Sequence, residues 1–114
     1  MDASENKKGY IDIDDALKRV GGNKGLYIRL LGRFIDGNHI DGLGSALSSG
    51  DLEAAAHLAH TLKGVSSNLS LQKVASLSAA LEQAVKNGED HKALWDELTN
   101  AYAVTIELIA EISE

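Results

Sequence analysis

The sequence contains no cysteine and no proline among its 114 residues. Without cysteine, the chain cannot form a disulfide or a thiolate metal site, and an intracellular, reducing compartment fits this composition. Without proline, no helix is interrupted by a residue that lacks a backbone N–H. Aromatic residues make up only 4% of the chain, whereas hydrophobic residues make up 44%. The apolar content comes mainly from Leu, Ala and Ile, which favours an all-α domain.

Excess positive charge and long apolar runs are also missing. The formal net charge is -6, and no basic stripe or aromatic platform offsets it, which argues against a nucleic-acid partner. No apolar run approaches the roughly 20 residues that cross a membrane, and residues 1–9 lack the apolar stretch of a signal peptide. We therefore expect a cytoplasmic protein without a membrane partner.

Turn-forming residues divide the chain into helical segments. Gly21-Gly22, Gly37-Asn38, Ser48–Gly50 and Asn87-Gly88 are typical of helix ends, and hydrophobic residues between them recur at steps of three and four. The helices are expected at about 13–20, 24–36, 39–48, 51–68, 71–87 and 91–112. Residues 1–9 are expected to be a disordered lead-in, and residues 10–114 a single domain.

Four of these segments have the length and apolar seam of a helical bundle. The residues of segment 51–68 that are expected to face inward are Leu52, Ala55, Ala59, Leu62, Ser66 and Leu69. Their steps of three and four indicate one buried stripe, and short connections make consecutive helices antiparallel. The sequence predicts an all-α fold, an antiparallel four-helix bundle with two additional short N-terminal helices.

A glycine follows a histidine by one turn inside segment 51–68. At 100° per residue, His60 lies about 130° from the centre of the apolar stripe, so its imidazole is expected to be exposed. Gly64 is its i+4 neighbour on that surface, and glycine in a helix costs about 1 kcal/mol relative to alanine. A glycine here opens space beside the imidazole for a tetrahedral group or a partner's backbone. A helix kink or a close helix crossing is the alternative explanation.

The next helical segment is expected to line the same groove. Glu82 and Lys86 lie on a flank displaced in the same rotational sense as His60, and such flanks face each other in an antiparallel pair. Counted from the intervening turn, His60 and Glu82 differ in height by about one helical turn. Lys63 lies one turn from His60, near the boundary of the core stripe. Glu82 and Lys86 are also explained as an i, i+4 surface pair.

The run His60-Thr61-Leu62-Lys63-Gly64-Val65-Ser66 resembles the signature of histidine-containing phosphotransfer (HPt) domains. The family pattern is roughly H-x-L-K-G-[SA]-[SA], followed by a leucine and a glycine. Leu69 fits the leucine, Val65 replaces a small residue, and Ser70 stands where the glycine is common. We expect Ser70 to be the N-cap of the next helix. The departure from the family pattern then changes the turn and leaves the site in place. The segments IDIDDALKRVGGNKGLYIRLLGRF and SGDLEAAAHLAHTLKG also look like the family, so the resemblance runs from about Tyr10 onward.

The resemblance implies a phosphorelay intermediate. A receiver-domain aspartate would pass its phosphoryl group to His60, which would pass it to another receiver domain. The family position that hydrogen-bonds the imidazole falls on Glu82, and the position of an auxiliary basic residue falls on Lys86. The implied partners are response-regulator receiver domains and a hybrid sensor histidine kinase, and we expect a monomer. No cofactor is expected on this chain, because receiver carboxylates would hold the Mg²⁺, and no independent kinase or hydrolase activity is expected.

The residues themselves can support this chemistry. With Glu82 accepting Nδ1–H, a neutral His60 ring would keep its lone pair on Nε2 as the nucleophile. Phosphoryl transfer depends mostly on positioning and on charge stabilisation at the phosphoryl oxygens, which Lys63 and Lys86 can supply. The chain has no G-x-x-x-x-G-K-[ST] loop, which argues against ATP binding.

Three other interpretations of these residues compete with this one. Glu53, His57 and His60 at i, i+4 and i+7 can bind a transition metal, but the sequence offers no fourth ligand nearby, and we predict no metal site. A catalytic triad is disfavoured because the serines near His60 lie on its own helix. A non-catalytic helical adaptor that binds receiver or kinase domains is the main alternative. The combination of His60, Lys63 and Gly64 argues against it.

Overall fold

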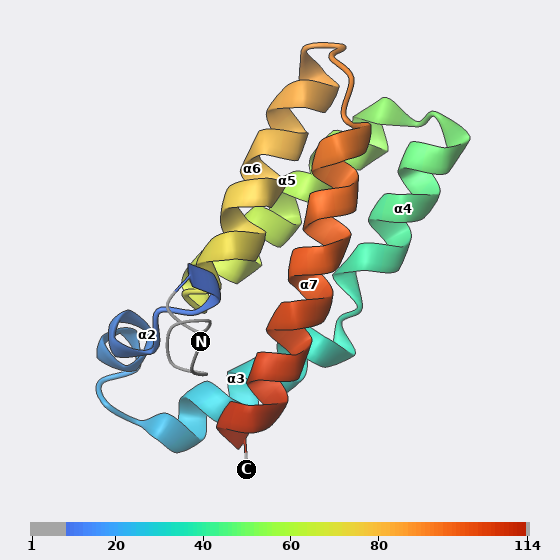
Figure 1. Cartoon of the computed structure of the whole chain (residues 1–114). Helices are drawn as coiled ribbons and strands as arrows, with labels where there is room; N and C mark the ends of the chain where they lie inside the picture. Colours follow the sequence, from blue (N-terminus) through green and yellow to red (C-terminus); the bar gives the residue numbers. More distant parts are fainter. Residues whose placement is uncertain (1–8, 114) are drawn as a thin grey trace.

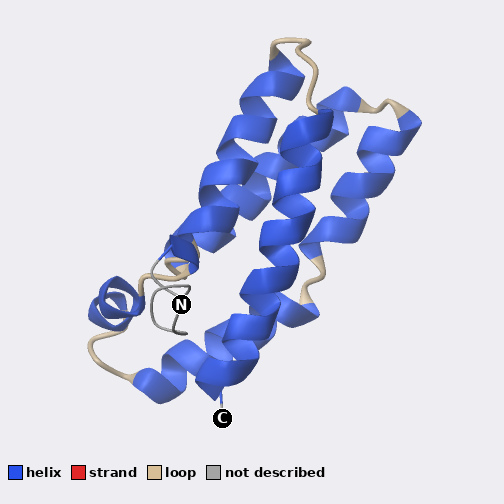
Figure 2. Cartoon of the chain, viewed as in Figure 1, coloured by secondary structure: helices blue, strands red, loops and turns tan. Residues whose placement is uncertain are grey.

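The computed structural model describes residues 9–113, and the regular structure of these residues is entirely helical (Figure 2). The helices are α2 (Ile13–Arg19), α3 (Lys24–Asp36), α4 (His39–Ser49), α5 (Leu52–Asn68), α6 (Gln72–Lys86) and α7 (Lys92–Ser113). The predicted all-α class is confirmed, and each helix end lies within one residue of its expected position. The expected lead-in of residues 1–9 lies outside the described residues, except for Gly9, which is helical.

Helices α4, α5, α6 and α7 lie side by side as a bundle in which consecutive helices reverse direction (Figure 1). Helix α5 packs along both α4 and α6, and α7 packs along α6 and α3. Trp95 of α7 reaches Gly44 of α4, where an added Cβ would stand 3.0 Å from the indole ring. Glycine at this position therefore lets the first and last helices of the bundle approach each other.

Small residues on α5 allow close packing against its neighbours. Ala55 and Ala59 are fully buried on the inner face of this helix, together with Leu62. The inward position expected for Leu52 is wrong, since its side chain is 41% exposed. Leu52 is the first residue of α5, at the end of the bundle where α6 has already ended at Lys86. Within the described residues, the helix that packs against this face of α5 therefore gives Leu52 little cover.

The N-terminal helices are attached to the turn that joins α5 to α6. The backbone N–H of Asp12 donates to the carbonyl of Ser70 at 3.0 Å, and the Tyr27 hydroxyl of α3 donates to the carbonyl of Leu69 at 2.8 Å. The Ser70 hydroxyl donates to Oδ2 of Asp15 at 2.7 Å. These bonds fix the connection between the two helices that carry the candidate site.

The expectation that Ser70 caps α6 is wrong. The N-cap residue is Leu71, whose side chain makes no capping hydrogen bond. Ser70 has a φ of 58°, in the left-handed region, and its hydroxyl bonds α2 through Asp15. Glycine adopts this conformation without steric cost. The backbone therefore explains why a glycine is common here in the family that the sequence resembles.

None of the helices in the described part of the chain is long and apolar enough to span a membrane.

Candidate functional site

Helix α5 presents His60 to solvent. The helix begins after Asp51, whose carboxylate accepts the Ala54 N–H at 3.1 Å, a typical N-cap bond. Its buried stripe includes Ala59 and Leu62, so the intervening residues point away from the core. The His60 side chain is 65% exposed, as its position on the helix predicts.

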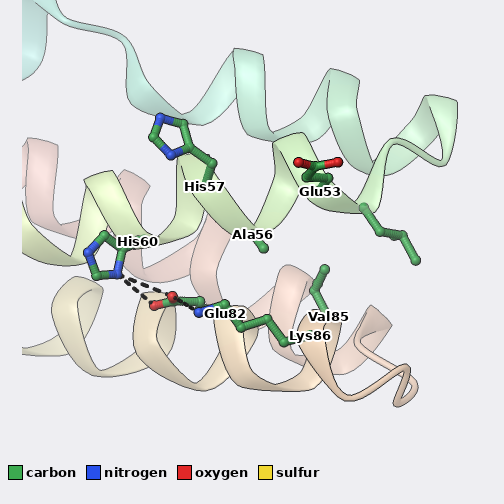
Figure 3. Close-up of a pocket in the computed structure, with 8 residues that line it drawn as sticks. Glu53, Ala56, His57, His60, Glu82, Val85 and Lys86 are labelled. Atoms are coloured by element: carbon green, nitrogen blue, oxygen red, sulfur yellow. Dashed lines mark hydrogen bonds and ion pairs between the residues drawn. The ribbon is translucent and has the colours of Figure 1, made fainter.

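The imidazole of His60 is held from one side by Glu82 of α6. Nδ1 lies 3.2 Å from Oε1 and 3.2 Å from Oε2 of that carboxylate (Figure 3). An ionised carboxylate can only accept, so this contact requires a hydrogen on Nδ1. In the neutral ring the lone pair is then on Nε2, the nitrogen that faces away from Glu82 in Figure 3. The structure thus brings His60 and Glu82 together as the sequence predicts.

Glu82 is a buried carboxylate that contacts two nitrogens, one on His60 and one on Lys86. Its side chain is only 5% exposed, and Nζ of Lys86 lies 2.8 Å from Oε2. The hydrogen bond from Lys86 lowers the pKa of Glu82, with a smaller lowering by His60, against the raising effect of burial. Glu82 is therefore ionised at neutral pH. Lys86 lies on the carboxylate and not on the imidazole.

Lys63 and Gly64 lie on the exposed surface of α5 beside His60. Lys63 is more exposed than the core-boundary position expected for it. A Cβ added to Gly64 would meet nothing within 4 Å, so no neighbouring helix crosses closely there. Packing between helices therefore does not account for this glycine.

A groove between α5 and α6 leads from His60 toward the start of α5. It is lined by Leu52, Glu53, Ala56, His57, His60, Glu82, Val85 and Lys86 (Figure 3). The apolar part of this groove, which consists of Leu52, Ala56 and Val85, was not predicted from the sequence. A signal was present, because Leu52, Ala56 and His60 follow one another at steps of four and so share one helix face.

The possible metal ligands do not gather around an ion site. His57 and Glu53 point away from Glu82 in Figure 3. Among residues 9–113, no group of three or more His, Cys, Asp or Glu side chains could hold a metal ion. The structure gives no support to the metal-binding interpretation.

The other three histidines have different surroundings. His39 is half-buried, with its ring centroid 5.2 Å from that of Phe34. His91 places Nδ1 3.1 Å from the backbone carbonyl of Glu89. His57 is exposed, and the hydroxyl of Thr61 donates to its backbone carbonyl at 3.1 Å. In the described part of the chain, His60 alone combines exposure with a carboxylate contact.

A family model described as Hpt domain matches residues 30–114, a span that includes α4 to α7 and every residue of the candidate site. No curated protein and no solved structure matches the chain significantly.

Proposed function

Because this chain belongs to the Hpt domain family, we propose that it carries phosphoryl groups between receiver domains on His60. Histidine phosphotransfer within a phosphorelay is the role that family membership supports. One observation supports the choice of residue above all others. His60 is exposed, and its Nδ1 lies against both oxygens of a buried carboxylate.

The geometry favours attack by Nε2. Glu82 holds Nδ1 as the hydrogen-bearing nitrogen, so the Nε2 lone pair is available to form a bond to phosphorus. The O–P bond of the partner's aspartyl phosphate breaks as the N–P bond forms, and the leaving carboxylate takes the electron pair. In the onward step, a carboxylate oxygen of the second receiver forms the O–P bond, and the N–P electrons return to Nε2. The Mg²⁺ is assigned to the receiver in both steps.

Lys63 is the cation of α5 that we assign to the phosphoryl oxygens. It lies one turn from His60 on the exposed surface, and it has no ion-pair partner within residues 9–113. Gly64 leaves open space beside it, where a Cβ would meet nothing. Positive charge at the transferring group is a major part of phosphoryl-transfer catalysis.

Incubation with phosphorylated receivers from the same cell tests the proposal. Label should appear on the chain in an acid-labile, alkali-stable form, and His60→Gln should abolish it while circular dichroism stays unchanged. His57→Gln, which removes a second exposed imidazole from the same helix, should keep full labelling. Label that persists in His60→Gln would refute the assignment. Receiver binding without any labelling would favour the non-catalytic adaptor.

Lys63→Ala tests the electrostatic assignment in the same assay. We expect slower transfer with a stability change below about 1 kcal/mol, because the exposed side chain has little packing to lose. Unchanged transfer kinetics would show that Lys63 does not act on the phosphoryl group.

A further inference from the structure

Helix α6 ends in a Schellman motif, which requires a left-handed residue directly after the C-cap. The C-cap is Asn87, with φ −86° and ψ 0°, and Gly88 follows with a φ of 68°. The Gly88 N–H donates to the carbonyl of Val85 at 3.3 Å, and the Glu89 N–H donates to the carbonyl of Ala84 at 2.9 Å. These are the two bonds of the motif, and its left-handed position favours glycine over residues with a Cβ.

The same glycine leaves the side-chain amide of Asn87 without cover. Among the asparagines of the chain, Asn87 alone precedes a glycine. Residues 86–90 are all exposed, and this connection between α6 and α7 lies at the end of the bundle away from the C-terminus (Figure 1). A Cβ added to Gly88 would meet nothing within 4 Å. Water and base therefore reach the peptide bond between Asn87 and Gly88 freely.

The other asparagines of the described chain are held or shielded. The side-chain oxygen of Asn23 accepts a backbone N–H at 3.0 Å, and the side-chain amide of Asn38 donates to a carboxylate at 2.8 Å. Asn68 and Asn100 lie in α5 and α7, and each precedes a residue that has a side chain. Within residues 9–113 the side chain of Asn87 has no hydrogen-bond partner. Asn87 is therefore the amide with the fewest restraints.

We propose that the Asn87–Gly88 step is a site of spontaneous deamidation that modifies the end of α6. Base removes the proton from the backbone nitrogen of Gly88, and this nitrogen attacks Cγ of Asn87. The new C–N bond closes a succinimide ring, and the side-chain nitrogen takes up a proton and leaves as ammonia. Water then cleaves one of the two imide C–N bonds and leaves a carboxylate. Cleavage at Cγ gives an aspartyl residue, and cleavage at the backbone carbonyl gives an isoaspartyl residue.

The helix end controls the rate of this reaction. The Gly88 nitrogen cannot attack while its N–H donates to Val85, so the last turn must open before the ring closes. That bond is 3.3 Å long, beyond the usual range for N–H···O bonds, and helix ends are among the first parts of a fold to open. We expect deamidation in the folded chain to be about 5- to 30-fold slower than in an unstructured peptide of the same sequence.

Both products weaken the end of α6, and the isoaspartyl product does so more strongly. Each adds a negative charge at the C-terminus of a helix, where the dipole disfavours it, and Glu89 and Asp90 follow directly. In the isoaspartyl product the main chain passes through Cβ, which inserts one carbon between the C-cap and Gly88. The Gly88 and Glu89 N–H groups can then no longer both reach their carbonyls.

The last turn of α6 also forms one end of the groove beside His60. Val85 and Lys86, the two residues before Asn87, line this groove together with His60. The isoaspartyl product therefore loosens the turn that carries two groove residues. The modification itself does not depend on the proposed function, because ring closure requires only Asn87, Gly88, base and water.

Peptide mapping by mass spectrometry of the full chain, incubated at mildly alkaline pH, tests the site. Both products should appear at position 87, faster at higher pH and before any change at the other asparagines, and isoaspartyl methyltransferase should label the isoaspartyl form. Asn87→Gln should abolish the reaction, because its longer side chain closes the ring far more slowly. A synthetic peptide that spans the same residues gives the unrestrained rate. Asn87 that stays intact after the peptide has converted, or earlier conversion at another asparagine, would overturn the proposal.

Amide hydrogen exchange tests the effect on α6. Asn87→Asp is the matched control, because it carries the same new charge on an unaltered main chain. We expect the N–H groups of Gly88 and Glu89 to stay protected in Asn87→Asp and to lose protection in the isoaspartyl form purified from the incubated wild type. Equal protection in the two forms would show that the end of α6 tolerates the longer main chain, and would overturn the proposed effect on the helix.

Discussion

At the scale of single residues, Gly64 is a position where we expect a substitution to change the stability of the domain and its transfer rate in opposite directions. Its Cβ position is empty, so Gly64→Ala should raise the stability of the domain by up to about 1 kcal/mol through helix propensity alone. The added methyl group would stand beside the imidazole, where the receiver and the phosphoryl group must approach. We therefore expect the thermal midpoint to hold or rise while the transfer rate falls, with larger side chains worse than alanine.

Gly32 provides the matched control for this substitution. It lies inside α3, and an added Cβ would also meet nothing within 4 Å. Gly32→Ala should raise stability by a similar amount and leave transfer unchanged, because it is on another helix. A Gly64→Ala domain that melted early and transferred normally would show that the glycine serves the fold.

The exposure of His60 was predictable because the helical period fixes which side of α5 each residue faces. Its contact with Glu82 was also within reach, since the turn sets the relative height of two antiparallel helices. The contact of Lys86 was predictable only as one of two options. A long side chain at i+4 can reach the carboxylate or the phosphoryl group, and that choice depends on rotamers and local charge, which periodicity does not contain.

At the scale of elements, the turn between α5 and α6 depends on the left-handed conformation of Ser70. Ser70→Gly loses the hydroxyl bond to Asp15 but relieves the backbone, whereas Ser70→Ala loses the same bond and keeps the steric cost. We expect the alanine variant to be less stable than the glycine variant by about 1 kcal/mol in denaturant unfolding. Equal stability of the two variants would mean that the positive φ at this position costs no free energy for a residue with a Cβ.

The role of Ser70 in this turn could not be predicted from the local sequence. The N-cap rule is local, and it favours a serine directly before a helix. The actual hydrogen-bond partner, Asp15, is 55 residues away in the chain. This hydrogen bond between distant parts of the chain overrides the local preference for an N-cap. The residues of the turn contain no pattern that predicts the bond. The exposure of Leu52 has a similar origin, because its periodicity is correct but the neighbouring helix ends before it.

Tyr27 is the second link between the N-terminal helices and this turn. Tyr27→Phe should destabilise the domain by about 1–2 kcal/mol at neutral pH, because the carbonyl of Leu69 loses its donor. Burial, with a smaller contribution from Asp12, raises the pKa of Tyr27 from 10.0 to about 12. The stabilising contribution of the neutral phenol is complete below pH 10 and is lost as the pH rises toward about 12.

The phenylalanine variant cannot ionise at this position, so the stability difference between it and the wild type should narrow at alkaline pH. Denaturant unfolding at pH 7 and at about pH 11 measures both values. A difference that stayed constant or widened would show that the buried hydroxyl does not retain its proton in the folded state.

At the scale of the whole molecule, acidic residues outnumber basic ones, 17 to 11, and two carboxylates tie separate elements together. The pKa of Asp15 is lowered first by the Ser70 hydroxyl and then by Arg19. The pKa of Glu82 is lowered first by Lys86. One carboxylate attaches α2 to the turn, and the other connects α6 to the histidine of α5. The stability of the fold and the state of the site therefore depend on the same type of group.

A depressed folded-state pKa means that the unfolded chain binds more protons in acid. The stability from Glu82 is therefore present above the ordinary carboxyl pKa and is lost as the pH falls through its lowered folded value. In urea unfolding from neutral to acid pH, the wild type should lose stability more steeply than Glu82→Gln, so their difference should narrow toward low pH. Glu97→Gln, which removes one exposed carboxylate of α7, should keep a slope close to that of the wild type. Parallel curves for the wild type and Glu82→Gln would mean that the Lys86–Glu82–His60 contacts do not favour the ionised carboxylate.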